Sequence, residues 1–402
     1  MSSFVTLTLG EVATFVRGIT FKPEDVVALG TEGSVACMRT KNVQENLDLS
    51  DVFAVKKDLV RRADQFLQEG DILVSSANSW NLVGKCSWIP ELQFSASFGG
   101  FVSVLRANPE KIFPRFLYWW FSSSRIQSLA RSFGNKTTSI SNLNFDRCLE
   151  LGIELPSLEE QMRISSILDQ AESLKIRRKD AVAELNVLIG ELFVDLFGDA
   201  RSIKERWEVK KLKDLVLEFR YGTSEKSGEH DTPVLRIPNV SKGEVDISDL
   251  KYVSLGVQEF ERLLLKDGDL LFVRSNGNPD FVGRCAVFES LNVERGFVYA
   301  SYLIRARLDR DIISPNYLCE FLLGSMGRKS LLSNSKTSAG QYNINIQGLG
   351  SIDVPVPPMQ MQEAFYKKLS SVKGLRQMHL DSLAKLEHLF DTLQVRAFRG
   401  EL

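Results

Sequence analysis

The side chains most used in enzyme active sites are few in this chain, and they are not spaced for catalysis. The 402 residues contain three histidines, His230, His379 and His388, none of which has the spacing of a metal-ligand pair. His230 lies in the polar segment 227–231, where a solvated loop histidine is the simplest interpretation. The five cysteines include no Cys-x-x-Cys pair, so neither a zinc ribbon nor a disulfide framework is indicated, and we expect reduced, partly buried thiols.

Three enzyme motifs are present only in part. The segment 79–86 resembles a phosphate-binding P-loop, but serine stands at its first glycine position and cysteine at its magnesium-binding position. The only Pro-Pro pair, 357–358, lacks the polar and aromatic neighbours with which a DNA adenine methyltransferase holds a flipped base. Pro279-Asp280 is not followed at a suitable distance by the Glu-x-Lys of a nuclease. The sequence therefore predicts a protein that is not an enzyme and has no catalytic residue, metal or cofactor, with a solitary methyltransferase or nuclease as an alternative.

The bulk composition is that of a soluble globular protein. Hydrophobic residues make up 44% of the chain and charged residues 25%. No stretch approaches the length of a membrane span, and residues 1–12 lack the basic and apolar regions of a secretory signal, so we expect a cytoplasmic protein. The net charge of −1 is no hint of nucleic acid binding, so any such surface must be a local concentration of positive groups.

The strongest feature of the sequence is an internal repeat with a period close to 200 residues. Five short segments recur in the same order at offsets between 197 and 201: 38–43 with 235–240, 70–74 with 268–272, 83–86 with 282–285, 114–117 with 315–318, and 153–156 with 354–357. Such a period is far longer than that of a solenoid. It indicates a duplication of whole domains.

Both repeats predict the same order of elements. A β-rich stretch with turn signals is followed by a helical segment and a proline-marked exit. A long helical segment begins after each exit. The resulting division is 1–157 and 201–357 for the two β-rich domains, and 158–200 and 358–402 for the two helices.

Apolar residues in both long segments alternate at steps of three and four, which predicts a coiled coil. The first series is Ile164, Ile167, Ala171, Leu174, Ala181, Leu185, Leu188 and Leu192, and the second is Phe365, Leu369, Val372, Leu383, Leu386, Phe390, Leu393 and Ala397. Arg178 and His379 interrupt the two series at equivalent positions. The first segment is acidic and the second slightly basic, which favours mutual pairing of the helices. The alternative is that each helix packs only on its own domain.

The whole chain resembles the specificity subunits of type I restriction-modification systems. The residues that carry the resemblance are the ending 393–402, the Pro-x-Pro exit followed by Gln362-Glu363, and the strand segment 268–275. The resemblance implies an α+β fold with two tandem, similar target-recognition domains, each followed by a long spacer helix, the two helices forming an antiparallel coiled coil.

The same resemblance implies a role in host defence and DNA methylation. Each recognition domain would read one half of a split duplex DNA target. The chain would act as a scaffold for two modification (methyltransferase) subunits and for restriction (motor-nuclease) subunits, to which S-adenosylmethionine and ATP belong. The alternative is a duplicated protein-binding adaptor without DNA specificity.

Candidate DNA-binding residues are polar side chains in equivalent loops of the two repeats. Arg and Lys suit guanine and phosphate, whereas Asn and Gln suit adenine. In the first repeat the candidates are Arg39, Lys41, Asn78, Trp80, Asn81, Lys136 and Thr137; in the second they are Arg236, Asn239, Arg274, Asn276, Asn278, Lys336, Gln341 and Asn343. The competing interpretation of each is a turn-stabilising side chain, and Asn276-Gly277 is itself a strong turn signal.

Overall fold

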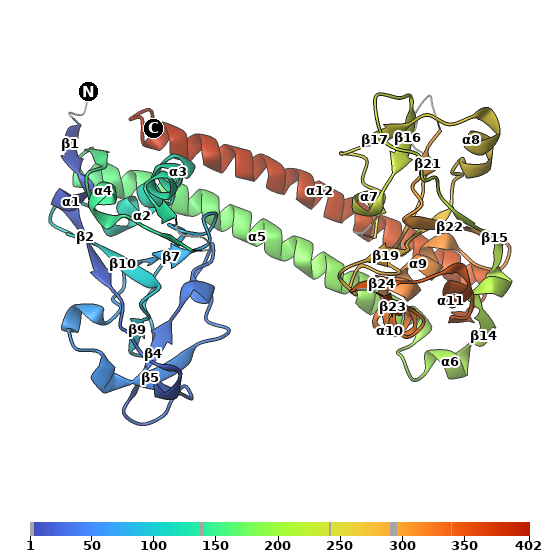
Figure 1. Ribbon diagram of the computed structural model, residues 1–402, viewed down its shortest axis with the longest axis horizontal. Coiled ribbons are helices and arrows are strands. Elements are labelled where there is room, and N and C mark those ends of the chain that lie inside the picture. The colour runs from blue at the N-terminus through green and yellow to red at the C-terminus, as the bar shows by residue number, and fades with distance from the viewer. Residues whose placement is uncertain (1–3, 137–139, 241–242, 290–295, 339) are drawn as a thin grey trace. The chain divides into compact units, whose positions relative to one another are not determined.

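The computed structural model describes residues 4–136, 140–240, 243–289, 296–338 and 340–402. It consists of two compact units, Met1–Lys179 with Asp381–Leu402 and Asp180–Leu380, which are blue to teal and yellow to orange over most of their length in Figure 1. Each unit contains one of the predicted β-rich domains and part of both long helices. The predicted domain boundaries themselves stay a prediction.

The first unit is built on a four-stranded antiparallel sheet in the order β2-β10-β6-β8. Its strands are β2 (Ala13–Arg17), β10 (Val102–Ala107), β6 (Ile72–Ser75) and β8 (Cys86–Trp88). Successive residues of a strand face opposite sides. Ile72 and Val74 therefore pack into the core on the helical side, whereas Leu73 packs into the core on the other side. Because both faces are covered, β6 is a continuous apolar run.

Helices cover one face of this sheet. They are α2 (Pro114–Ser122), α3 (Ser124–Ser132) and the first part of the long helix α5 (Leu158–Phe197). Aromatic residues of α2 are buried in this core, and Ile164 and Leu168 of α5 belong to it as well. Just before α5, β13 (Gly152–Leu155) pairs with the N-terminal strand β1 (Val5–Thr8). The short helices α1 (Leu9–Val12) and α4 (Phe145–Leu149) follow β1 and precede β13.

A second sheet, the outer sheet, covers the other face. Its order is β3-β5-β4-β9, with β3 (Val26–Val27), β5 (Phe53–Lys56), β4 (Ser34–Met38) and β9 (Ala96–Phe98). β9 runs parallel to β4, whereas the other pairs are antiparallel. The first unit thus has three layers, namely helices, central sheet and outer sheet.

The second unit repeats these layers. Its central sheet has the order β15-β22-β18-β20, and its outer sheet has the order β17-β16-β21. The bounds are β14 (Glu208–Lys211), β15 (Val216–Tyr221), β16 (Thr232–Leu235), β17 (Lys251–Val253), β18 (Leu270–Val273), β20 (Cys285–Val287), β21 (Val298–Tyr299), β22 (Leu303–Leu308) and β25 (Asp353–Val356) for strands, and α6 (Ile203–Arg206), α7 (Ile237–Val240), α8 (Val257–Leu263), α9 (Pro315–Leu323), α10 (Ser325–Ser333), α11 (Ile346–Gly350) and α12 (Met359–Ala397) for helices.

A buried glutamine fastens the start of each long helix to its domain. The Gln161 side chain accepts the Phe113 N–H (2.8 Å) and donates to the Pro156 carbonyl (2.9 Å). Gln362 accepts the Ser314 N–H (2.7 Å) and donates to the Pro357 carbonyl (2.8 Å). The recurring glutamine of the sequence repeat therefore joins the proline exit to the N-cap residue of α2 or α9.

The long helices run antiparallel within each unit. In the first unit, Lys175 Nζ of α5 lies 4.3 Å from the ring centroid of Phe390 on α12. In the second, Arg376 of α12 donates to Asn186 Oδ1 of α5 (3.2 Å), and the Phe193 and Phe365 rings lie 5.6 Å apart. The α+β fold with paired antiparallel helices is thus confirmed.

The predicted helix seam is right for α12 and partly wrong for α5. All eight predicted α12 positions are buried or half-buried. On α5, Leu174 is 51% exposed and Leu188 43% exposed. The inward position beside Leu174 is taken by Lys175, because an α-helix drifts relative to a strict heptad repeat. Within the described ranges, no helix is long and apolar enough to cross a membrane.

Candidate nucleic-acid interface

A small three-stranded sheet in the second unit brings together most of the predicted residues of that repeat. Its order is β19-β24-β23, with β19 (Ser275–Asn276), β24 (Gln341–Asn343) and β23 (Lys336–Ser338). The predicted residues on it are Asn276, Lys336, Gln341 and Asn343. Segments about 60 residues apart in sequence are therefore adjacent in space.

The strand register shows which of these side chains share a face. Asn343 lies opposite Ser275 on one neighbour and opposite Lys336 on the other. Opposed residues project to the same side, so these three and Gln341, two positions along β24, form one polar row. Tyr342 projects the other way and packs against the helical-side core. The face with Lys336, Gln341 and Asn343 is thus directed away from the core.

The first unit has the same small sheet. Its order is β11-β12-β7, with β11 (Asn135–Lys136), β12 (Ser141–Asn142) and β7 (Ala77–Asn78). Asn78 lies opposite Ser141, which in turn lies opposite position 136. Trp80 and Asn81, both exposed, follow β7 in the next turn. Thr137 lies outside the described residues.

An exposed aromatic residue adjoins each small sheet, and neither was predicted from the sequence. Phe101 is 65% exposed and Tyr302 59% exposed, and they occupy equivalent places before β10 and β22. The Phe101 carbonyl accepts the N–H groups of Ser76 (3.0 Å) and Ala77 (3.1 Å), and the Tyr302 carbonyl accepts that of Arg274 (2.8 Å). Each aromatic is therefore tied to the start of the strand that carries Asn78 or Asn276.

Close backbone packing holds these aromatic residues in place. A Cβ atom at Gly18 would lie 2.3 Å from the Gly99 carbonyl oxygen, and one at Gly222 would lie 2.2 Å from that of Tyr299. Only glycine fits where the chain leaves β2 or β15 and crosses the turn that precedes the aromatic. In the first unit, Phe101 also lines a cavity of about 720 Å³ together with apolar residues and Arg39.

The predicted arginines of the first loop, Arg39 and Arg236, are held by carboxylates of their own loop. Arg39 lies 3.4 Å from Asp51 Oδ2 and stacks over the Phe53 ring, and Arg236 lies 2.9 Å from Asp249 Oδ2. Lys41, which is exposed, also pairs with Asp51 (2.5 Å). These three cations stay candidates for DNA contact, but each already forms an ion pair with a neighbouring aspartate.

Asn239 is a correction to the predicted set. Its side chain is buried, accepts the Arg236 N–H (2.8 Å), and donates to the carbonyls of Asp246 (2.7 Å) and Asp249 (3.0 Å). The amide that would have read a base instead holds the loop. Asn42 does the same in the first unit.

Asparagines in the turn after β19 also make local bonds. Asn276 Oδ1 accepts the Asn278 N–H (2.9 Å), and Asn278 Oδ1 accepts the Asp280 N–H (2.9 Å). Arg328, from α10, donates to the carbonyls of Val282 and Pro279 and fixes the same turn. Burial is the main cause that lowers the pKa of the Arg328 guanidinium. The turn that carries Asn276 and Asn278 is therefore rigid before any ligand arrives.

Arg274 lies between the core strand β18 and the small sheet. Its guanidinium stacks over the Tyr221 ring (4.8 Å to the centroid), and its carbonyl accepts the Ile344 N–H (2.9 Å). Tyr221 Oη in turn accepts the Ile346 N–H (3.4 Å). A cation and an aromatic ring thus stand together at the edge of the polar row.

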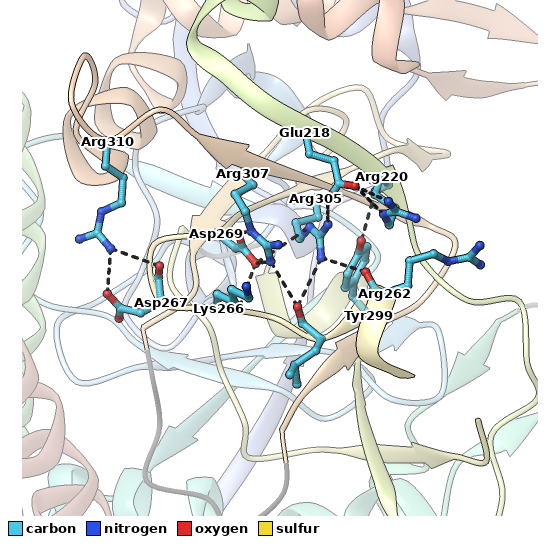
Figure 2. A network of polar contacts seen from close by, with 11 residues as sticks. Glu218, Arg220, Arg262, Lys266, Asp267, Asp269, Tyr299, Arg305, Arg307 and Arg310 are labelled. Atoms are coloured by element: carbon cyan, nitrogen blue, oxygen red, sulfur yellow. Dashed lines mark hydrogen bonds and ion pairs between the residues drawn. The ribbon is translucent and has the colours of Figure 1, made fainter. Parts of the chain in front are cut away.

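A polar network fixes the start of β18 and appears in Figure 2. Arg307 holds Asp269 with two hydrogen bonds, of 2.8 and 2.7 Å. Arg305, only 1% exposed, binds Glu218 and the carbonyls of Arg262 and Leu264. Glu218 also binds Arg220, and this hydrogen bond is the main cause that lowers the pKa of the Glu218 carboxyl. The network connects the central sheet to the segment before β18.

Comparison with known proteins decides the family. The family model described as "Type I restriction modification DNA specificity domain" matches residues 1–184 and 204–388. The chain belongs to this family.

Individual specificity subunits align over nearly the whole chain. The EcoKI specificity subunit of Escherichia coli (strain K12) is 31% identical over 99% of this chain and 89% of its own length. The StySPI specificity subunit of Salmonella potsdam is 26% identical with the same coverage. The S subunit crystal structure from M. genitalium shares the fold, with a TM-score of 0.58 and 16% identity over 99% of this chain and 96% of that one.

Groups suited to catalysis in this specificity subunit are buried or dispersed. All five cysteines are free and buried, and burial raises the pKa of the Cys37, Cys86 and Cys148 thiols to about 12. Such thiols are poor nucleophiles. Across the described part of the chain, no group of three or more His, Cys, Asp or Glu side chains is arranged to hold a metal ion.

Proposed function

We propose that this specificity subunit binds a split duplex DNA target, with one half-site read by the small polar sheet and the adjoining aromatic of each unit. The observation that carries the proposal is the recurrence of the same constellation in both units. Both small sheets have the same strand order, and an exposed aromatic is hydrogen-bonded at the start of the strand that carries Asn78 or Asn276, although the strand registers place different side chains on the two sheets.

The residue types suit the two tasks of DNA recognition. Lys336, Arg274 and Lys136 would contact phosphates or guanine, and Asn78, Gln341 and Asn343 would contact adenine edges. Trp80, Phe101 and Tyr302 offer ring faces for contact with bases or sugars. Further candidates outside these sets are the exposed Lys41, Asn81 and Asn278 and the half-buried Asn276, with Arg39 and Arg236 acting from the loop held by Asp51 or Asp249.

The duplication supports a scaffolding role. Two similar units present two similar surfaces, which suits two copies of one methyltransferase subunit. Restriction subunits would join the same assembly in the cytoplasm, where the free thiols stay reduced. Catalysis and its cofactors, S-adenosylmethionine and ATP, are assigned to those partners, so the purified chain should not methylate or cleave DNA by itself.

A binding titration with duplex DNA at several salt concentrations tests the proposal. Specific binding should weaken steeply with salt, and Lys336→Gln should reduce the slope of log K against log salt by about 1. A chain that binds no duplex but captures the methyltransferase subunit would instead support the adaptor alternative. Methyl transfer by the purified chain alone would show that the assignment of catalysis to partners is wrong.

A further inference from the structure

Each unit contains a glutamate that reaches from the recognition domain to a long helix. In the first unit, Glu45 lies in the loop after β4, and its carboxylate is 2.9 Å from Lys179 Nζ and 3.7 Å from Lys175 Nζ on α5. The hydrogen bond from Lys179 is the main cause that lowers the pKa of the Glu45 carboxyl. The loop is thus joined to the helix by two cations.

The second unit has a similar arrangement, in which Arg376 occupies the helix position that corresponds to Lys175. Glu244, in the loop after α7, forms an ion pair with Arg376 of α12 and lies 3.9 Å from Lys373 Nζ. Burial disfavours the charged form of Lys373, but Glu320 (3.0 Å) and Glu244 outweigh it and raise its pKa. The two sets, Glu45–Lys175–Lys179 and Glu244–Lys373–Arg376, are called the loop–helix clusters.

Each cluster also contacts the other long helix. Lys175 stacks on the ring of Phe390 from α12, and Arg376 donates to Asn186 of α5. A recognition loop, its own helix and the antiparallel helix therefore meet at one point in each unit.

The clusters lie where the outer sheet is otherwise separated from the helices. In the first unit, the loop passes the edge strand β8, where Ser87 Oγ donates to the Gln44 carbonyl (2.6 Å). In the second, Glu244 forms an isolated bridge with Val287 of β20. Among the described residues, the outer-sheet cores contain no residue of α5 or α12, whereas the inner cores do.

Apolar packing leaves space beside the second cluster. Glu244, Tyr366 and Lys373 line a cavity of about 340 Å³ between the loop and α12. Where side chains do not fill the space, the charged contacts set the distance between loop and helix. The ion pairs of Glu244 therefore join the loop to α12 beside this space.

We propose that Glu45 and Glu244 are positioning residues that hold the loops carrying the DNA-contact candidates Lys41 and Arg236 against the spacer helices, and so restrict the number of base pairs between the two half-sites. The inference rests on the proposed DNA-reading function. DNA advances ~3.4 Å per base pair and turns once in about ten. A small shift of one loop therefore changes which spacer length lets both units contact their half-sites at once.

The test is methylome sequencing of a host that carries the complete system with Glu45→Gln, Glu244→Gln or both. Both half-site sequences should stay unchanged. Targets with a spacer one base pair longer or shorter should gain methylation by about two- to fivefold relative to the native spacing, the range expected for an exposed ion pair. The combined charge reversal Glu45→Lys with Lys179→Glu should restore the native preference.

The matched control is Glu24→Gln, which breaks another exposed ion pair of the same domain (Lys22–Glu24, 3.5 Å) without a helix partner. It should leave the spacer preference unchanged. If Glu45→Gln does not accumulate, Glu45→Asp retains the charge but shortens its reach, and it should broaden the preference in the same direction.

Native spacer preference in both the Gln and the Asp variants would overturn the proposal, and so would a changed half-site sequence. Failure of the proposed DNA-reading function has a different signature, because the wild-type chain itself would then bind no split target. Broadened spacing with intact half-sites, reversed by the charge swap, supports the positioning role.

Discussion

The two recognition units have the same fold, but different side chains lie beside an ion pair that both units contain. Arg106 binds Asp71 in the first unit (2.7 Å) as Arg307 binds Asp269 in the second. Beside this common pair, the first unit has Thr14, Val16 and Val104, and the strand register places Glu218, Arg220 and Arg305 at the matching positions of the second. The comparison teaches that the arginine–aspartate pair belongs to the fold, whereas the buried charges near it belong to one unit alone.

The largest effect is expected when one partner of the extra network is removed. Arg305→Ala leaves Glu218 and the carbonyls of Arg262 and Leu264 without their buried donor, and should lower the free energy of unfolding by about 3–5 kcal/mol. Denaturant titration of the purified chain, followed by a probe in the second unit, measures this. Val104→Ala is the matched change in the first unit and should cost only about 2 kcal/mol, because it removes two buried carbons.

Transplanting the lining of the first unit sharpens the comparison. The triple change Glu218→Thr, Arg220→Val and Arg305→Val replaces a charged network by the residues that the first unit already uses. Only Arg305 of this network is fully buried, and replacing buried ion pairs by apolar residues is often neutral or stabilising. If the triple variant is as unstable as Arg305→Ala, the side chains at matching strand positions of the two units are not interchangeable. The network would then stabilise the second unit through contacts other than those between the paired strand positions.

A smaller effect is expected from the exposed aromatics. Phe101→Ala should weaken binding of split-target DNA by about 1–3 kcal/mol, the range for loss of a stacking contact, and Tyr302→Ala should do the same through the other half-site. The salt slope should not change, because no charge is removed. Phe94→Ala and Tyr252→Ala are the controls, since both residues are exposed aromatics away from the small sheets. Equal losses in the controls would mean that exposure alone, not position, explains the effect.

The smallest effect is a difference in acid sensitivity. The pKa of Glu218 is lowered from 4.5 in the folded unit, first by its bond to Arg220. A carboxyl with a lowered folded pKa stabilises the protein above its unfolded pKa, and this contribution is lost as the pH falls through the folded pKa. Because Glu218 is partly exposed, the loss should be below about 1 kcal/mol. Unfolding free energies between about pH 5 and pH 3 should therefore fall less steeply in the triple variant.

The sequence repeat predicted the fold because the fold depends on features that recur in the sequence or follow a regular spacing. The apolar run of β6 and β18, the glutamine after each proline exit and the α12 seam all recur or alternate in ways that packing requires. The α5 seam failed at Leu174 because an apolar residue was counted without regard to Lys175. That lysine reaches an inward position by pairing with Glu172 and Glu45.

The candidate interface was predictable only at the level of loops. Asn239 was misassigned because its residue type is equally suited to reading a base and to bonding its own loop. Phe101 and Tyr302 were missed because an aromatic residue is ordinarily expected in a core. Their one sequence signal is the recurrence of an aromatic residue immediately before a central strand in both repeats. Which side chains face outward depends on the register of small sheets whose strands are two or three residues long, and so short a segment carries no periodicity.

The central claim is that each small sheet reads its own half-site. The most direct measurement is methylome sequencing of a host in which Gln341 and Asn343 of the second unit are changed to Ala within the complete system. The account predicts that one half of the methylated target loses its sequence restriction, while the other half and the spacer length stay unchanged. Loss of restriction in both halves, or a target unchanged in both, would contradict it.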